Sequence, residues 1–211
     1  MHSPINGRQR RVAGGRQAVR LADGARVIVR PIGEEDAEGF AHAFTRLSDE
    51  SRRRRFLSAS PRLSARALTY LTAVDHDQHV ALVAVEPKSG EILGSVRYVR
   101  IAERRAELAI EVIDDWQGRG LGRALLEAIS AHAHANGLTR FTALVAADNR
   151  PMQHALKRAV VTVEVDHGEL EYVLDVDALA PAPRRSPAIR STPAPATTPS
   201  GPRLQPAAIP A

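Results

Sequence analysis

The stretch DDWQGRGLGRALLEAI, residues 114–129, decides the fold of this chain. Gly118, Gly120 and Gly122 stand at every second position, directly before a run with helical periodicity. Glycine in or beside a helix costs roughly 1 kcal/mol relative to alanine, so three together indicate a functional need. A helix start presents unpaired N–H groups and a partial positive charge, and glycine lets the backbone approach a bulky anion. The pattern therefore predicts a phosphate-binding loop.

The segments around this loop predict a mixed α/β domain. Before the loop we expect a strand at 26–32 and then three helices, at 33–47, from Ser48 and from Ser64. A meander of three antiparallel strands follows, at 79–87, 91–100 and 105–114. After the loop we expect a helix at 119–136, a strand at 139–147 and a helix at 149–159. A closing hairpin at 160–176 turns at Gly168. The fold class is thus one α/β (α+β) domain with a central, mostly antiparallel sheet flanked by helices.

Composition limits the class of protein. A chain of 211 residues with 44% hydrophobic content can build one packed core. It has no Cys, which excludes disulfide scaffolds, thiolate metal sites and cysteine nucleophiles. No run approaches the ~18 apolar residues of a membrane span, and the N-terminus lacks the apolar block of a signal peptide. We expect a soluble, cytoplasmic protein without a metal.

The basic residues are concentrated in the two ends of the chain. The net charge is +5, yet residues 1–20 hold five Arg and no acid, and residues 178–211 hold four Arg and no acid. The second segment also contains nine of the fourteen prolines, a composition that disfavours folding. We expect a basic flexible tail at 1–20, a folded domain at 21–177 and a Pro/Ala-rich disordered tail at 178–211.

Two common phosphate-binding loops do not match. A P-loop requires Lys and a Ser or Thr after its last glycine, whereas Arg123 and Ala124 follow Gly122. A dinucleotide-binding loop requires Gly-x-Gly-x-x-Gly after a first parallel strand, whereas here the spacing is Gly-x-Gly-x-Gly after an antiparallel meander. Nucleotide hydrolysis and dinucleotide binding are therefore disfavoured.

The residues Gln117–Gly122, QGRGLG, resemble the Gln/Arg-x-x-Gly-x-Gly/Ala signature of the GCN5-related N-acetyltransferases, the GNAT family. The element order, the strand AELAIEV before the loop and DNRPMQHALKRA (148–159), which looks like that family's Asn helix, agree with this resemblance. It covers about 21–176, and it implies that the loop cradles the pyrophosphate of coenzyme A.

Within the family the chain most resembles the acetyltransferase domain of bacterial Pat-type protein lysine acetyltransferases, in stretches such as VIVRPIGEEDAEGF and AELAIEVIDDWQGRGLG. It has no room for a fused synthetase-like or cyclic-nucleotide domain. In addition, RAVVTV stands where most relatives carry Leu-Gly-Phe. These departures leave the regulation, the protein substrate and the end of the cofactor site open.

Acetyl transfer to an amine requires a base, because an acceptor lysine with a pKa of about 10.4 arrives as an ammonium. The resemblance implies a carboxylate on the strand before the loop. Glu107 and Glu111 lie there on one face, since they are four residues apart. Glu107 matches the acid of the lysine acetyltransferase branch and is the preferred base. Glu111 is the alternative base, and an ordinary surface pair of Glu107 with Arg104 or Arg105 is the non-functional alternative.

The resemblance also implies the cofactor contacts. Backbone at Val112 or Ile113 would hold the pantetheine arm and the developing oxyanion, and Asn149 would either contact the cofactor or cap its helix. The full predicted cofactor-binding set is Val112, Ile113, Gln117, Gly118, Arg119, Gly120, Leu121, Gly122 and Asn149. No general acid is evident, because Tyr172 is better explained as a cross-strand packing residue.

Two function classes follow. The first is an acetyl-CoA-dependent N-acetyltransferase without a covalent enzyme intermediate, whose acceptor is a protein lysine or, as second choice, a small amine or an N-terminus. The second is a non-catalytic acyl-CoA-binding regulator tethered to nucleic acid or an acidic partner by its Arg-rich tails. We expect neither a membrane partner nor nucleic-acid binding by the folded domain.

Overall fold

The computed structural model describes residues 15–57, 63–166 and 169–180. The tail residues 1–14 and 181–211, and the predicted turn at Gly168, lie outside these ranges. The described strands are β1 (Gln17–Arg20), β2 (Arg26–Pro31), β3 (His79–Val85), β4 (Ile92–Ala102), β5 (Arg105–Val112), β6 (Arg140–Ala146), β7 (Val160–Asp166) and β8 (Glu169–Asp175). The helices are η1 (Glu34–Asp36), α1 (Ala37–Thr45), α2 (Asp49–Phe56), α3 (Ala65–Thr72), η2 (Asp114–Trp116), α4 (Leu121–Ala135), α5 (Arg150–Leu156) and α6 (Val176–Leu179).

One eight-stranded sheet in the order β1-β2-β3-β4-β5-β6-β8-β7 carries the described fold. Every neighbouring pair is antiparallel except β5 and β6, which are parallel. The predicted α/β domain with a mostly antiparallel central sheet is therefore confirmed. One strand was not predicted: β1 lies inside the segment assigned to the N-terminal tail, so the sheet begins at Gln17 rather than after residue 20.

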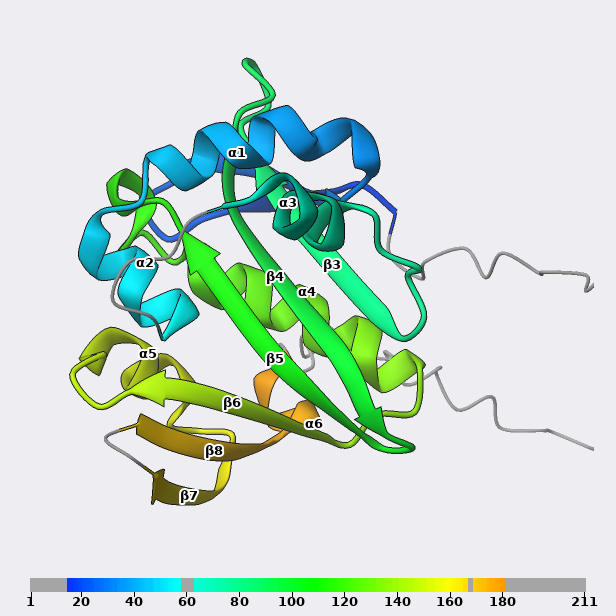
Figure 1. Cartoon of the computed structure of the whole chain (residues 1–211), viewed down its shortest axis with the longest axis vertical. Helices are drawn as coiled ribbons and strands as arrows, with labels where there is room; N and C mark the ends of the chain where they lie inside the picture. The colour runs from blue at the N-terminus through cyan, green and yellow to red at the C-terminus, as the bar shows by residue number, and fades with distance from the viewer. Residues whose placement is uncertain (1–14, 58–62, 167–168, 181–211) are drawn as a thin grey trace, which may run out of the picture. The chain divides into compact units, whose positions relative to one another are not determined.

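Helices cover both faces of the sheet (Figure 1). The helices α1, α2 and α3 lie on one face, and α4 lies on the other against β3, β4 and β5. Leu121, Leu125 and Ile129 are fully buried on one side of α4, as their helical spacing predicts. Together the two layers bury a single apolar core that includes β3 along its whole length.

The strands β5 and β6 diverge, and this divergence positions the site. They pair only where Arg105–Glu107 lies beside Arg140–Thr142, and beyond Glu107 they separate toward their C-terminal ends (Figure 1). The rest of β5 therefore has an edge without a strand partner on the β6 side. A gap between two diverging strands is a place where an extended ligand can add hydrogen bonds to the backbone.

Candidate functional site

The free edge of β5 is defined by the hydrogen bonds on its other side. The Ile113 N–H donates to the Leu93 carbonyl at 3.0 Å, next to the antiparallel pair of Gly94 and Val112. Because hydrogen-bonded and non-hydrogen-bonded pairs alternate in an antiparallel ladder, the Val112 and Ile110 backbone groups point away from β4, toward the gap. Of the two predicted backbone sites, Val112 thus faces the gap, whereas the Ile113 N–H is already used inside the sheet.

The glycine loop lies at the end of this edge and starts α4. Gly118 and Gly120 have φ angles of +71° and +91°, a left-handed conformation that favours glycine. Gly120 is the N-cap of α4 and has no side chain to bond the first N–H groups, so those donors remain free for a ligand. The Leu121 side chain is buried under the helix, and a Cβ added at Gly122 would lie 4.0 Å from the side chains of Ile110 and Val112. The N-terminus of α4, a helix of 15 residues, therefore lies beside the edge of β5.

Arg119 contacts protein groups in the loop. Its Nε donates to Asp23 at 2.5 Å, and its guanidinium lies 3.9 Å over the ring of Trp116. Asp23 belongs to the turn between β1 and β2, so this unpredicted first hairpin lies against the glycine loop. The ring of Trp116 forms the floor under Arg119.

Gln117 and Asp114 connect the loop to α2. The Gln117 amide Nε2 donates to the Ser51 hydroxyl at 3.1 Å and to the Val112 carbonyl at 3.0 Å. The Asp114 carboxylate accepts from the backbone N–H and the hydroxyl of Ser48 and from the hydroxyl of Ser51. Since Ser48 caps α2, the N-terminus of this helix is attached directly to the loop.

Glu107 and Glu111 occupy the same face of β5 but differ in surroundings. Glu107 is exposed, and among the described residues it has no hydrogen-bond or ion-pair partner, so the expected alternative of a pair with Arg104 or Arg105 is not observed. Glu111, by contrast, is 10% exposed and ion-paired with Arg55, and it accepts a hydrogen bond from Ser95.

The charge of Glu111 is fixed by these partners. Burial alone would raise the pKa of its carboxyl, but the Arg55 and Arg97 guanidiniums and the Ser95 hydroxyl outweigh burial and hold the pKa below its usual value. A carboxylate that is ionised and already bonded is a poor proton acceptor. Of the two acids, Glu107 is the one whose carboxylate is free to act as a base.

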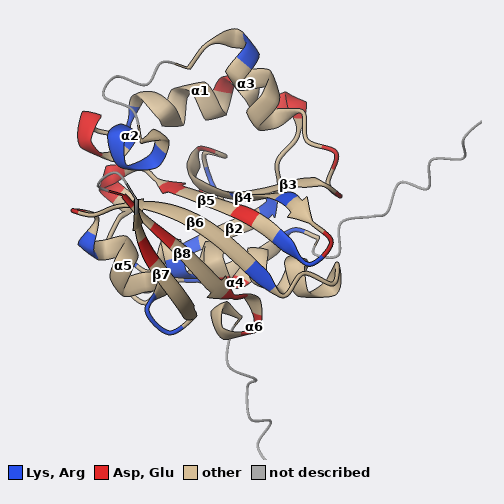
Figure 2. Ribbon diagram, turned by 60° about the horizontal axis from the view of Figure 1, so that its bottom comes forward, with Lys and Arg blue, Asp and Glu red and all other residues tan. Residues whose placement is uncertain are grey.

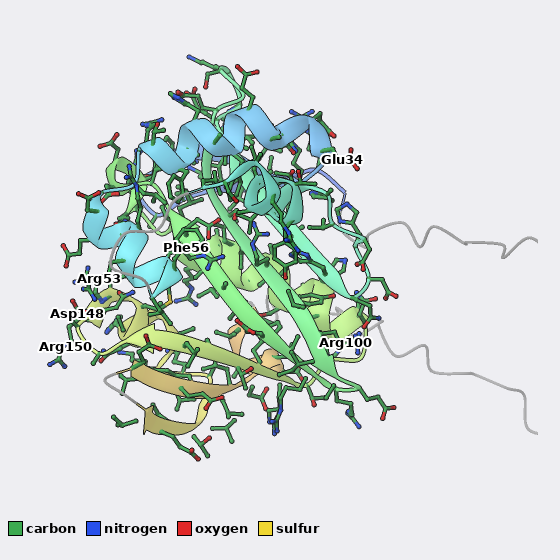
Figure 3. The ribbon with its side chains drawn as sticks, viewed as in Figure 1. Glu34, Arg53, Phe56, Arg100, Asp148 and Arg150 are labelled. Atoms are coloured by element: carbon green, nitrogen blue, oxygen red, sulfur yellow. The ribbon has the colours of Figure 1, made fainter. Side chains whose placement is uncertain are left out.

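The β6 side of the gap is closed by arginines of α2. Arg53 and Arg54 form ion pairs with Asp148, in the loop after β6, and Figure 3 shows Arg53 and Asp148 side by side. Figure 2 shows the run of arginines as the blue part of the α2 ribbon. Together with Arg55, which pairs with Glu111, these arginines attach α2 to both sides of the gap.

Asn149 caps α5 in the structure. Its Oδ1 accepts from the Met152 N–H at 3.2 Å, with Pro151 in the first turn. Of the two roles expected for Asn149, this bond is the helix cap. The neighbouring Arg150 points outward in Figure 3.

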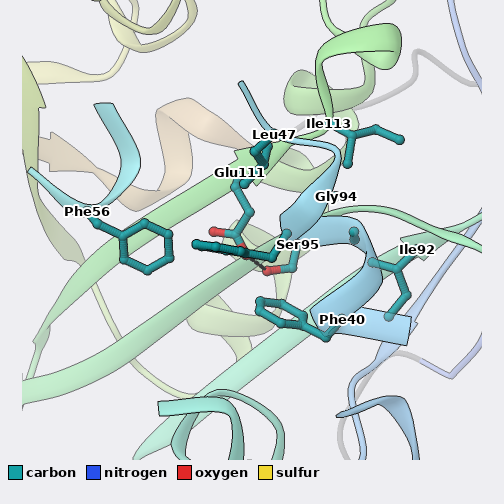
Figure 4. A pocket seen from close by; sticks show the side chains of 10 residues that line it. Phe40, Leu47, Phe56, Ile92, Gly94, Ser95, Glu111 and Ile113 are labelled. Carbon is teal, nitrogen blue, oxygen red and sulfur yellow. Dashed lines mark hydrogen bonds between the residues drawn. The ribbon is translucent and has the colours of Figure 1, made fainter. Parts of the chain in front are cut away.

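A pocket lies under α1 and α2, against the ends of β4 and β5 (Figure 4). Its walls include Phe40, Leu47, Phe56 and Ile92, and Glu111 reaches its floor beside Ser95. Glycine is required at Gly94, because a Cβ there would lie 2.7 Å from the Glu111 carbonyl oxygen. The pocket therefore opens beside the same part of β5 that borders the gap.

Comparison with known proteins identifies this arrangement. A family model described as an acetyltransferase (GNAT) domain matches residues 26–159. The chain belongs to the GNAT acetyltransferase family. An acetyltransferase from Pseudomonas aeruginosa is 35% identical to this GNAT chain over 136 residues, which cover 63% of this chain and 73% of the relative.

Two further relatives are of the Pat type. The acetyltransferase Pat of Mycolicibacterium smegmatis is 35% identical over 75% of this GNAT chain, and the match spans only 48% of that longer protein. The crystal structure of the GNAT domain of S. lividans PAT has a TM-score of 0.71 and 36% identity, covering 76% of this chain and 96% of that one. The predicted resemblance to Pat-type domains is confirmed at the level of the domain.

None of the described helices is long and apolar enough to cross a membrane. In the same part of the chain, no group of three or more His, Asp or Glu side chains is arranged to hold a metal ion.

Sequence reasoning missed the residues that assemble the site around α2, namely Ser48, Ser51, Arg53, Arg55, Asp114 and Asp148. Ser48 carried a local signal, since serine before a polar run is a typical helix N-cap. The long-range partners carried none, because Arg55 and Glu111 are 56 residues apart.

Proposed function

We propose that this GNAT domain transfers an acetyl group from acetyl-CoA directly to an amine, with a protein lysine as the preferred acceptor. The supporting observation is the position of three features around one gap: the free backbone edge of β5, the N-terminus of α4 with its glycine loop, and the carboxylate of Glu107, which has no partner among the described residues. Similarity to Pat-type domains favours a lysine acceptor over a small amine or an N-terminus.

In this proposal the cofactor lies along β5. The pyrophosphate binds the free N–H groups at Gly120–Gly122, where the partial positive charge of the helix favours an anion. The pantetheine arm runs from there along the edge of β5. The Val112 N–H donates a hydrogen bond to the arm, and the Val112 carbonyl, which accepts from the Gln117 amide in this structure, accepts one from it. The thioester is at the far end of the arm, beyond Val112 in the direction of Glu107. Its carbonyl is placed at the next free amide, Ile110, in place of the predicted Val112 or Ile113.

The reaction then needs one proton removed and one supplied. Glu107 lies three residues from Ile110, about 10 Å along a strand, so its carboxylate takes the proton of the lysine ammonium through water. The lysine nitrogen attacks the thioester carbon, and the Ile110 N–H stabilises the oxyanion. As the C–S bond breaks, the attacking nitrogen loses its second proton to water, and the coenzyme A thiolate, with a pKa near 8.5 by analogy to cysteine, takes up a proton from the same water.

The test is calorimetric titration of acetyl-CoA into wild type and into Gly120→Glu, which places a carboxylate where the pyrophosphate is expected. We expect binding by wild type and at least a hundredfold weaker binding by the variant. A circular dichroism spectrum establishes that the variant is folded. Equal binding by both proteins would show that the loop is not the pyrophosphate site, and no binding by wild type would remove the cofactor from the proposal.

A further inference from the structure

The pocket beside β5 is apolar except at its floor. Phe40, Phe44, Leu47, Phe56 and Ile92 supply its walls, and Glu111 is the only charged side chain among the described residues that line it. In Figure 4 the Glu111 carboxylate points toward Ser95 from between these walls. A ligand group that enters the pocket therefore meets hydrocarbon on most sides and one carboxylate.

The pocket lies where an acyl chain would extend. In the proposed function the thioester carbonyl is at Ile110, and the next residue along β5 is Glu111. The side chains of Ala109 and Glu111 both point to the face covered by α1 and α2, because side chains alternate along a strand. An acyl chain longer than acetyl that leaves the thioester on this face therefore passes Glu111 as it enters the pocket.

The Glu111 carboxylate cannot move away from such a chain without breaking its bonds. The Arg55 guanidinium and the Ser95 hydroxyl hold its two oxygens, and Arg55 and Glu111 are only 13% and 10% exposed. Arg97 lies behind Ser95, 3.5 Å from its hydroxyl, and donates to the Leu71 carbonyl at 3.0 Å. Neither arginine lines the pocket, and Arg55 partly offsets the charge of Glu111. The Arg55 and Ser95 donors are both directed at Glu111, so the described lining offers no free side-chain donor to a second carboxylate.

From this geometry we propose that the pocket accepts short uncharged acyl chains and that Glu111 excludes acyl chains ending in a carboxylate. This inference rests on the proposed function. A carboxylate-tipped chain would bring a second negative charge next to Glu111 in a mostly apolar site, where like charges repel more strongly than in water and lost hydration is not replaced. Glu111 is thus a specificity-determining residue rather than a base.

Butyryl-CoA and succinyl-CoA form a matched pair of probes, because their acyl chains have the same length and differ by a methyl group against a carboxylate. Calorimetric titration of each into the full chain needs no acceptor. We expect wild type to bind butyryl-CoA at least tenfold more tightly than succinyl-CoA. Equal dissociation constants for the two in wild type would overturn the proposal while leaving acetyl-CoA binding intact.

Variants assign the discrimination to Glu111. In Glu111→Gln the Arg55 cation loses its partner at the pocket edge, so we expect the ratio of the two dissociation constants to fall at least tenfold. Glu127→Gln is the matched control, because Glu127 is also paired with an arginine, Arg123, but on α4 outside the pocket. It should keep the wild-type ratio, and an unchanged ratio in Glu111→Gln would overturn the proposal.

A second variant covers a failure of Glu111→Gln to fold. Arg55→Gln/Glu111→Gln removes both charges of the buried pair, and we expect its ratio to fall below that of wild type. A wild-type ratio in this double variant would contradict the inference. If wild type binds neither acetyl-CoA nor butyryl-CoA, the proposed function fails and the inference fails with it, which distinguishes this result from equal binding of the two probes.

Discussion

Asp114 accepts hydrogen bonds from the backbone N–H of Ser48 at 2.9 Å and from the Ser48 hydroxyl at 2.7 Å. One carboxylate at the start of the cofactor loop therefore holds the N-cap of the helix that covers the gap. These bonds lower the pKa of Asp114 against the opposing effect of burial, so the group is ionised at neutral pH. If the glycine loop binds the cofactor as proposed, Asp114 connects cofactor binding to the position of α2.

Asp114→Ala removes these bonds. We expect a loss of about 1 kcal/mol in the free energy of unfolding, typical of a lost helix cap, and a several-fold weaker affinity for acetyl-CoA. Urea unfolding and calorimetry measure the two effects. Asp115→Ala is the control, since Asp115 is 76% exposed and contacts Arg46 alone among the described side chains. Equal effects of both substitutions would show that the contact with Ser48 is unimportant.

Gly120→Ala separates backbone strain from cofactor binding. Gly120 and Gly137 both have left-handed φ angles, +91° and +76°, and an added Cβ would meet no atom closer than 3.7 Å at either position. Each alanine substitution should therefore cost a similar free energy of unfolding, about 1 kcal/mol. Only Gly120→Ala should also weaken acetyl-CoA binding. The prediction fails if Gly137→Ala, at the opposite end of α4, weakens binding to the same extent.

The buried His79 makes stability depend on pH. Burial lowers its pKa from 6.5 to about 4, and the positive charge of Arg97 adds to the effect. The unfolded chain therefore binds a proton below pH 6.5 that the folded chain resists until about pH 4, so stability is lost as the pH falls through this range. This difference between the two pKa values corresponds to a loss of roughly 3 kcal/mol in the free energy of unfolding.

Urea unfolding across this pH range measures the effect. His79→Phe keeps a ring against Tyr70, whose centroid is 4.9 Å from that of His79, and removes the titration. Its stability should depend less steeply on pH, with a residual slope from His76 and His132, whose pKa values burial also lowers. A wild-type slope in His79→Phe would refute the assignment.

Local patterns in the sequence predicted most of the fold and the cofactor loop. Periodicity located α4 and the meander of β3, β4 and β5, because those signals lie within one element. The glycine spacing predicted a loop at the start of α4 for the same reason, and the structure shows left-handed φ angles at Gly118 and Gly120 in that loop. The short strand β1 was missed because its four residues have no such pattern and are ordered by pairing with β2.

The contacts that distinguish Glu107 from Glu111 could not be read from the sequence. Both acids lie on one face of β5, and only the folded chain brings Arg55 onto one of them. Likewise, the choice among Ile110, Val112 and Ile113 depends on which amides β4 already uses. Tertiary contacts of this kind have no local signal.

The most direct test of the account is the rate of acetyl transfer to a lysine peptide in wild type and in Glu107→Gln, followed by mass spectrometry of the peptide and by thiol release. Because Glu107 is exposed and unpaired among the described residues, the variant should keep wild-type stability and acetyl-CoA affinity. Its turnover should fall by about 10² to 10⁴, the usual contribution of a general base. Unchanged turnover in Glu107→Gln, with acetyl-CoA bound and the peptide acetylated, would contradict the assignment of Glu107 as the base.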